Sequence, residues 1–253
     1  MHLPFSVEII DRSASSHGVW HSHAEGQIFM LYRGLITVET YVGVWAIPPK
    51  LIGWIPPNCN HCGISYGQII ASSIKVTAEY CKLLPDTPCV VSASTLMLAL
   101  IDRLDSAYLE RVLGTPEINV LRVLVDEIAR AVCEPLYLPM PTDPRLTRMA
   151  LAIINEPSSQ VSLDEWAVQL YISRRTLTRR FKKETGLSLG QWRLQAKLHY
   201  ALRMLSEGSS VTQVAIDLGY NSISAFSRSF KSVFGFSPSF CSDTKRILQV
   251  RTS

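Results

Sequence analysis

The chain has 253 residues, of which 47% are hydrophobic and 18% charged. This composition excludes a disordered or low-complexity protein, and the length is comfortable for two domains. The net charge of +4 is unevenly divided: residues 1–141 hold 9 Lys and Arg against 13 Asp and Glu, whereas residues 142–253 hold 16 against 8. We therefore expect a neutral or acidic module joined to a basic module that binds a polyanion.

Neither membrane insertion nor export is predicted. No apolar run reaches the ~18–20 residues of a membrane-spanning helix. The first residues also lack the basic segment and the apolar stretch of a secretory signal. We expect a cytoplasmic protein with no membrane partner, whose six scattered cysteines are reduced thiols.

The first part of the chain, residues 5–85, has the composition of β-strands. Residues 27–32 and 35–45 are rich in Val, Ile, Thr, Tyr and Phe, and we expect Arg33-Gly34 between them to form a turn. Residues 68–81 are a further strand-like run. Short strands at this spacing predict a sandwich or a small barrel.

Residues 94–134 change to a helical period, with Gly114-Thr115-Pro116 between two helices. Each helix is expected to bury one apolar stripe, which consists first of Leu96, Leu100, Leu104, Tyr108 and Val112, and then of Ile118, Leu121, Leu124, Val125, Ile128 and Val132. The helices, at 95–113 and 117–132, either cover the sheet or form a dimer interface. The four prolines of residues 134–144 predict an extended linker.

An internal duplication lies in the basic part of the chain. Residues 179–186 and 228–235 both fit R-x-F-K-x-x-x-G, at an offset of 49. The match extends upstream to an Ala-x-x-Leu pair and a serine in each copy, namely Ala167, Leu170 and Ser173 against Ala215, Leu218 and Ser222. Each copy therefore predicts the same unit of helix, turn and helix.

In each unit the second helix is expected to begin at its serine cap and to end at a glycine. Aromatic and leucine side chains would face the core, with Leu177 and Phe181 in the first copy and Phe226 and Phe230 in the second. The outward face then holds Arg174, Arg175, Thr178 and Arg179 in the first copy, and Ile223, Ser224, Ser227 and Arg228 in the second.

Arginines in this pattern suit DNA, because a guanidinium can bind guanine or phosphate bidentately. The pattern is typical of a helix-turn-helix, whose second helix enters the major groove. Residues 189–205 predict one continuous helix between the two units. This helix would hold the two recognition helices apart, as binding to successive major-groove faces ~34 Å apart requires. Phosphate contacts are expected from Lys182, Lys183, Arg193 and Lys231.

The stretch from Val161 to Phe240, about a third of the chain, resembles an AraC/XylS-type DNA-binding domain. The resemblance implies a bacterial transcription regulator, activator or repressor, whose base-reading residues fall on Arg175, Thr178, Arg179, Ile223, Ser224 and Arg228. Two positions depart from the family pattern. Tyr171 occupies a turn position where the family often has Gly, which predicts a reshaped first turn, and Cys241 stands where an Arg is common.

A histidine cluster marks the β-rich part. His21 and His23 would share one face of a strand, because the strand period is two, and Gln27 would lie on the same face. His61 follows a proline-rich turn and could return to this place. The spacing resembles the two cupin motifs, which commonly supply three histidines and a carboxylate; here Gln27 replaces the carboxylate. The set could hold a divalent metal such as Zn, Ni or Fe, or line a metal-free ligand pocket, or be structural.

The predicted fold is a multidomain α+β protein. A cupin-like sensor barrel (1–90) is followed by a helical dimerisation or covering segment (91–134), a linker (135–144) and an all-α AraC-type DNA-binding domain with two helix-turn-helix motifs (145–253). We expect a sequence-specific DNA-binding regulator, not an enzyme, that responds to a small molecule or metal in the cupin pocket. Its expected partners are double-stranded DNA, a small-molecule effector, a second copy in a homodimer and, for an activator, RNA polymerase. The alternatives are a cupin metalloenzyme with a nucleic-acid-binding tail and a ligand-independent DNA-binding dimer.

Overall fold

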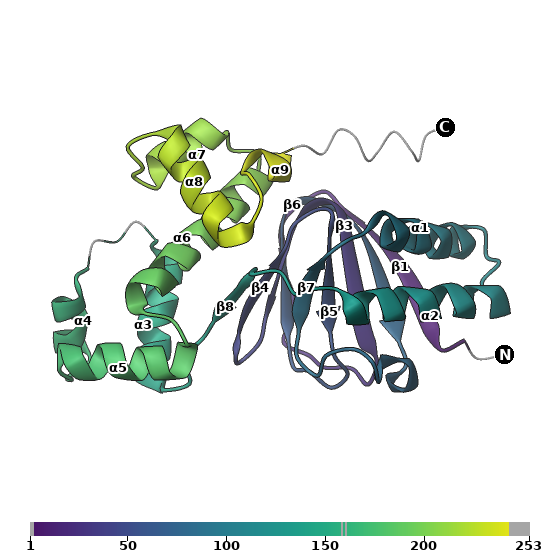
Figure 1. Ribbon diagram of the computed structural model, residues 1–253, viewed down its shortest axis with the longest axis horizontal. Helices are drawn as coiled ribbons and strands as arrows, with labels where there is room; N and C mark the ends of the chain where they lie inside the picture. Colours follow the sequence, from purple (N-terminus) through teal and green to yellow (C-terminus); the bar gives the residue numbers. More distant parts are fainter. Residues whose placement is uncertain (1–2, 158, 160, 243–253) are drawn as a thin grey trace. The chain divides into compact units, whose positions relative to one another are not determined.

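The computed structural model describes residues 3–157, 159 and 161–242, and the side chains as far as residue 240. Within this range the chain forms two compact units, one of residues 3–40 and 45–137 and one of residues 41–44 and 138–242. The first unit is rich in β-sheet and the second is helical (Figure 1). This division confirms the predicted order of a sheet-rich region followed by a helical one. Among the described helices, none is long and apolar enough to cross a membrane.

The sheet contains eight strands, in the spatial order β1-β6-β3-β4-β8, with β2 on β6, β5 on β3 and β7 on β5. Their bounds are β1 Phe5–Arg12, β2 Ser16–His17, β3 Gly26–Glu39, β4 Gly43–Ile47, β5 Leu51–Ile55, β6 Cys62–Val76, β7 Cys89–Ser92 and β8 Tyr137–Pro139. The long strands β3 and β6 run antiparallel, and Gln27 pairs with Lys75 in their register. This pairing places Gln27 and Lys75 in the wall of the same cavity.

Two of the predicted strand limits are wrong. Arg33-Gly34 is not a turn but an irregularity inside β3, because both sides of it pair with the same strand β6. Gly34 has a φ of 89°, and a Cβ there would come within 2.5 Å of the Gln68 carbonyl oxygen, so only glycine fits this bulge. The last residues of the run 68–81 form the 3-10 helix η1, Ala78–Cys81, instead of a strand.

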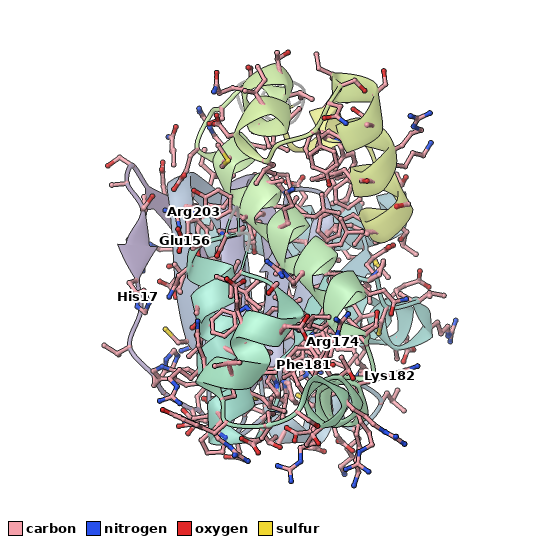
Figure 2. All side chains as sticks on the ribbon, turned by 90° about the vertical axis from the view of Figure 1, so that its left-hand side faces the viewer. His17, Glu156, Arg174, Phe181, Lys182 and Arg203 are labelled. Carbon is pink, nitrogen blue, oxygen red and sulfur yellow. The ribbon has the colours of Figure 1, made fainter. Side chains whose placement is uncertain are left out.

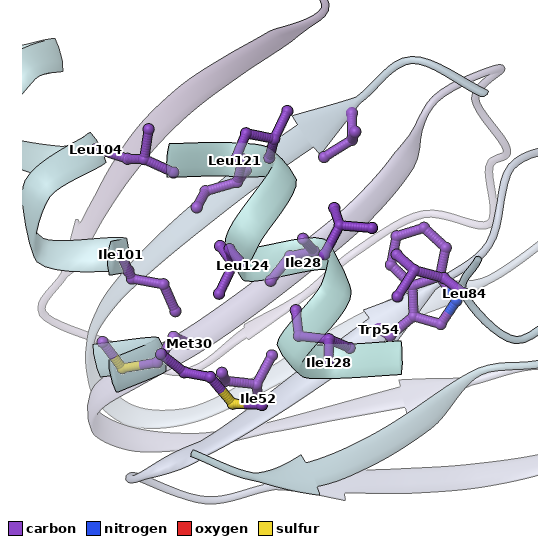
Figure 3. Close-up of a cluster of buried hydrophobic side chains, with 14 of the residues drawn as sticks. Ile28, Met30, Ile52, Trp54, Leu84, Ile101, Leu104, Leu121, Leu124 and Ile128 are labelled. Carbon is purple, nitrogen blue, oxygen red and sulfur yellow. The ribbon is translucent and has the colours of Figure 1, made fainter. Parts of the chain in front are cut away.

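Helices α1 (Thr95–Leu109) and α2 (Thr115–Arg130) lie against the sheet and share its core (Figure 1). Figure 3 shows Ile101 of α1 and Leu124 of α2 among the side chains that pack with Ile28 and Ile52. The core also holds an acidic residue, Asp105 of α1, which accepts hydrogen bonds from the hydroxyls of Tyr32 and Ser72 at 2.8 and 2.6 Å. These bonds fix α1 to β3 and β6.

The stripe predicted for the first helix is partly wrong: Leu104 is fully buried and Leu100 packs against the core, but the other predicted positions are exposed. The side chains that α1 buries are Met97, Ile101, Leu104, Asp105 and Ala107, whereas Leu96 and Tyr108 are 48% and 40% exposed. Apolar residues occur on more than one face of this helix, so their period alone does not select the buried face. In the same way Val112 and Val132 lie beyond the ends of α1 and α2 and are exposed.

The helical unit consists of α3 Pro144–Asn155, α4 Leu163–Gln169, α5 Arg174–Thr185, α6 Leu189–Ser206, α7 Val211–Asp217, α8 Ile223–Phe234 and α9 Ser239–Ser242. The 18 residues of α6 confirm the predicted connecting helix, which is about 27 Å long. Around its first half, Phe181 and Trp192 form one core; Phe226, Phe230 and Phe234 of α8 are fully buried in another.

The proline-rich segment before α3 is packed. Residues 137–139 form β8, and Leu138 and Met140 belong to the core around Trp192. The Trp192 indole N–H donates a hydrogen bond of 2.6 Å to the Pro139 carbonyl. The segment predicted as a linker therefore contributes to the helical unit.

Candidate functional site

Helix α5 has the limits that its capping residues predict. The Ser173 hydroxyl accepts a hydrogen bond from the Thr176 N–H at 3.2 Å, and Gly186 ends the helix in the left-handed conformation. Leu177 and Phe181 are fully buried. Phe181 lies inside the unit, whereas its neighbour Lys182 is exposed (Figure 2). These contacts fix which face of α5 meets solvent.

The exposed face of α5 is strongly cationic, but its cations fall into two groups. Arg174 forms an ion pair with Asp164 at 3.0 Å, and Arg180 lies 3.5 Å from Asp143. Within the described residues, the other four take part in no ion pair: Arg175, Arg179, Lys182 and Lys183. These four cations are free to bind an anion without breaking an internal contact.

Helix α8 repeats this design with less charge. Its cap Ser222 accepts from the Ala225 N–H at 3.1 Å, and Gly235 ends it in the left-handed conformation. Each solvent-side residue of α8 lies 49 positions after one of α5, so the set Arg174, Arg175, Thr178, Arg179 and Lys182 corresponds to Ile223, Ser224, Ser227, Arg228 and Lys231. Of the five α8 residues, Ser227 is half-buried and the other four are exposed.

The two inter-helix turns have the same hydrogen bonds. The Tyr171 N–H bonds to the Val168 carbonyl and the Ile172 N–H to that of Ala167; the N–H groups of Gly219 and Tyr220 bond in the same way to Ile216 and Ala215. This is the pattern of a Schellman turn. The expectation that Tyr171 reshapes the first turn is therefore wrong.

Arg193 has a structural role that the sequence did not indicate. Its guanidinium donates to the carbonyl oxygens of Val161 and Ser159 at 2.8 and 2.6 Å. These bonds tie α6 to the segment before α4. They occupy the Arg193 guanidinium, which was predicted to contact phosphate, with internal partners instead. The side chain of Cys241, the other departure from the family pattern, lies outside the described side chains.

The sheet unit brings three histidines together. Ring centroids are 4.4 Å apart for His21 and His61, 5.2 Å for His23 and His61, and 5.9 Å for His21 and His23. His21 and His61 exchange backbone hydrogen bonds of 3.0 and 2.9 Å, which place them directly opposite each other. The segment of His21 and His23 precedes β3 and is not a strand, so strand periodicity was the wrong reason for a correct grouping.

Each histidine is oriented by a backbone carbonyl. The Nδ1 atoms lie 2.9, 2.6 and 2.9 Å from the carbonyl oxygens of Val19, Glu25 and Cys59 for His21, His23 and His61 respectively. A carbonyl only accepts, so each Nδ1 carries a proton and each neutral ring keeps a lone pair on Nε2. One ring nitrogen of each histidine lies within 4.8 Å of the others. Metal-binding histidines are commonly oriented in this way.

Protonation of this cluster is opposed at its buried member. His61 is 2% exposed. Burial lowers the pKa of His61; its hydrogen bond to the Cys59 carbonyl raises the pKa, and the nearby His21 and His23 lower it further. Burial therefore favours the neutral form of His61, which is the form that coordinates a cation.

Gln27 faces the cluster. Its Oε1 lies 3.0 Å from His23 Nε2, and its Nε2 donates to the Ser73 hydroxyl at 2.8 Å. An oxygen and a bare imidazole nitrogen repel each other unless a proton or a cation lies between them. With the amide turned over, Gln27 would donate to His23 and accept from Ser73. The position therefore suits either a bound cation or a hydrogen-bonded cap on His23.

A cavity of about 270 Å³ opens beside the cluster inside the sheet unit. Three residues of the candidate site line it, namely His21, Gln27 and His61. Its charged lining residues are Glu8, Arg12 and Lys75. Its apolar lining residues are Ile10, Phe29, Ile36, Val38, Ile55, Ile64 and Ile69. The sequence did not indicate Glu8, Arg12 or Lys75. Glu8 follows the buried Val7 in β1 and Lys75 lies between two buried residues of β6, so alternation could have found these two. Arg12 lies at the exposed end of β1, where alternation gives no signal.

Known proteins resemble this chain over both units. A protein-family model described as "Helix-turn-helix domain" matches residues 166–242. The chain is 31% identical over 226 residues to the HTH-type transcriptional regulator NimR of Escherichia coli, a match that covers 86% of this chain and 80% of NimR. It is 29% identical over 140 residues to the HTH-type transcriptional regulator RipA of Corynebacterium glutamicum, over 54% of this chain and 40% of RipA.

Among solved structures, ToxT from Vibrio cholerae with an unsaturated fatty acid bound aligns over 93% of this chain and 94% of its own, with 12% identity and a TM-score of 0.39.

Proposed function

The chain belongs to the AraC-type helix-turn-helix transcriptional regulators, and we propose which of its surfaces bind DNA and what its sheet unit senses. The protein is a DNA-binding transcription regulator rather than an enzyme. We propose that α4–α5 and α7–α8 are its two helix-turn-helix motifs, and that α5 and α8 each enter a major groove of double-stranded DNA. The equal spacing of the solvent-side residues of α5 and α8 carries this proposal.

The residues of the two faces have different roles in this proposal. Base edges are read by Arg175, Thr178 and Arg179 in α5 and by Ile223, Ser224, Ser227 and Arg228 in α8. Arginine suits guanine, and the Ile223 side chain suits a thymine methyl group. Lys182, Lys183 and Lys231 contact phosphates and fix the register on the duplex. Arg174 joins them when DNA phosphate replaces Asp164 as its partner.

Selection from random duplexes tests the DNA proposal directly. Bound duplexes should share two short motifs whose centres are about one helical turn, or ~10 base pairs, apart. Footprinting on the DNA upstream of the protein's own gene should then protect the same pair of motifs. Enrichment of a single motif would mean that only one of the two helices reads bases, and no enrichment would contradict both assignments.

We propose that the sheet unit is a cupin-like sensor barrel and that its cavity binds a small effector. The three histidines would hold a divalent transition metal such as Zn, Ni or Fe, which would supply a Lewis acid for ligand binding in the cavity. Support comes from the three carbonyl-oriented rings and from the Gln27 oxygen that faces His23. Metal analysis of the purified protein should find about one equivalent in the wild type and none after His61→Ala. Absence of stoichiometric metal in the wild type would leave a metal-free ligand pocket.

Two alternatives are separated by simple observations. A cupin metalloenzyme with a DNA-binding tail would need a general base at the metal, and Gln27 stands where such a site commonly has a carboxylate. A ligand-independent DNA-binding dimer would show the same operator affinity with and without any effector. A change in operator affinity on effector binding supports allosteric coupling instead.

We also propose that the protein is a homodimer, with α1 and α2 of the 91–134 segment as the interface. Exposed apolar side chains on these helices support this assignment, namely Leu96, Leu109 and Val123. Sedimentation should show a dimer, and Leu109→Glu should shift it toward monomer. If the regulator activates transcription, RNA polymerase is a further partner.

A further inference from the structure

The cavity of the sheet unit contains a lysine that forms no ion pair with another described residue. Lys75 of β6 is half-buried, lines the cavity and lies opposite Gln27 in the β3–β6 register. Within the described residues, no ion pair joins Lys75 to a carboxylate. An ammonium group that is removed from water gains most from an anionic partner. Lys75 is therefore available to bind an anion in the cavity.

The other charged groups of the cavity leave its wall positive. Glu8 and Arg12 lie on β1 with Ile10 between them, and residues two apart point to the same face of a strand. Arg12 donates one hydrogen bond of 3.2 Å, to the Ser16 hydroxyl. The two cations and one carboxylate together carry a net charge of +1. A monoanion balances this charge, whereas a cation would add to it.

The rest of the wall is apolar and selects for an organic body. Branched aliphatic side chains and one aromatic ring surround the space, including Ile36, Val38, Ile55, Ile69 and Phe29. The volume of 270 Å³ lies near the lower end of the range of about 300–1,000 Å³ that is usual for ligand pockets, which suits a small molecule. Inorganic phosphate or sulfate would leave these apolar side chains without contacts.

We propose that this cavity binds a small organic carboxylate, with its apolar body against the isoleucine wall and its head group on Lys75 and Arg12. The inference rests on the proposed sensor function, because it names the chemical class of the effector. A charge-assisted hydrogen bond to the carboxylate at Lys75 would favour the anion over a neutral compound of the same shape.

Calorimetry with matched probes tests the proposal. The full-length protein is dialysed against EDTA and then against chelator-free buffer, so that a bound metal does not contribute. The probes are butyrate, hexanoate and benzoate, the amide of each acid, and hexylamine. At least one acid should bind, and it should bind about tenfold or more tightly than its amide.

Charge variants should shift this preference in opposite directions. Lys75→Gln should lower the affinity for the carboxylate about tenfold and leave the affinity for the amide unchanged. Glu8→Gln should raise the affinity for the carboxylate, since it removes a like charge. Lys82→Gln is the matched control, because Lys82 is an exposed lysine of the same unit that does not line the cavity. Thermal unfolding of each variant confirms that the fold is retained.

Three results would overturn the proposal: no acid binds, the amide binds as tightly as its acid, or hexylamine binds best. Binding of the selected DNA duplexes tests the DNA-binding function separately from the carboxylate proposal. If the protein binds its operator but no acid, the carboxylate proposal fails and the DNA-binding function stands. If an acid binds the cavity with no effect on operator affinity, the ligand class stands and the sensor function fails.

Discussion

Tyr171 and Gly219 occupy the same position in the two helix pairs, and both have a left-handed backbone, with φ of 54° and 69°. Glycine adopts this conformation freely, whereas a residue with a Cβ is strained in it by roughly 1–2 kcal/mol. The Tyr171 side chain is 94% exposed, so packing does not compensate for the strain. The first helix pair therefore keeps its turn at a cost in stability that the second does not have.

Tyr171→Gly should raise the free energy of unfolding by about 1 kcal/mol, because it removes the strain and loses almost no contact. Gly219→Ala should lower it by a similar amount, since a Cβ there meets no atom within 4 Å and only the backbone is strained. Urea unfolding of the full chain measures both. Tyr171→Ala is the control, and it should leave stability nearly unchanged. A gain in stability with Ala would show that the tyrosine ring, and not the backbone, is unfavourable.

Arg179→Ala and Lys183→Ala should weaken DNA binding in different ways. The arginine variant should lose about 1–3 kcal/mol on the selected operator and relax specificity at one base pair. The lysine variant should bind all sequences more weakly and reduce the salt dependence of log K by about one phosphate contact. Gel-shift titrations on operator and random duplexes at several salt concentrations measure this. Arg203→Ala, in the last turn of α6, is the control, and equal effects of the first two variants would contradict the assigned roles.

His199 should make the helical unit sensitive to acid. Both of its ring nitrogens are buried without a hydrogen-bond partner among the described residues. Burial lowers the pKa of His199 to about 4, whereas the unfolded chain has the ordinary value near 6.5. As the pH falls below 6.5, His199 therefore binds a proton in the unfolded state but not in the folded state. The free energy of unfolding should fall by about 2 kcal/mol between pH 7.5 and pH 5.

The His199 effect is measured from urea unfolding at the two pH values. His199→Leu should be more stable than the wild type at pH 5 and should lose less stability between the two values, because it replaces an unpaired polar ring by an apolar side chain. An unchanged pH dependence in the variant would assign the acid sensitivity to another group.

The buried carboxylate of Asp105 should stabilise the sheet unit through its two hydroxyl partners. Asp105→Ala leaves the hydroxyls of Tyr32 and Ser72 without this acceptor and should lower the free energy of unfolding by about 2–4 kcal/mol. Asp105→Asn keeps one oxygen acceptor and should lose less. Asp102→Ala, an exposed position of the same helix, is the matched control. Comparable losses at both positions would mean that helix propensity, and not the buried acceptor, is responsible.

The helical unit could be predicted closely from its sequence because its signals are local. Ser173 and Gly186 mark the two ends of α5 by their own chemistry, and the second copy repeats both marks 49 residues later. A duplicated pattern also fixes which residues face outward, since both copies must bury the same positions. The departure at Tyr171 could not be judged locally, because the hydrogen bonds of the turn decide its shape.

The sheet unit was less predictable because its structure depends on distant pairing. Arg33-Gly34 is a typical turn sequence, but the residues before and after Gly34 both pair with β6. Leu96 looked buried because α1 is apolar on several faces, and the sheet selects which face it covers. Lys75 could not be placed beside the histidines without the β3–β6 register. His61 could be placed beside the other histidines, because it follows a proline-rich turn that indicates a return of the chain.

If α5 and α8 read DNA as proposed, the unequal charge of the two helices gives the motif pair contacted by one chain a direction. An arginine-rich helix and a nearly neutral helix would not both match a sequence with two-fold symmetry. The motif pair read by one chain would then be asymmetric, and its orientation relative to a promoter would become part of the regulatory signal.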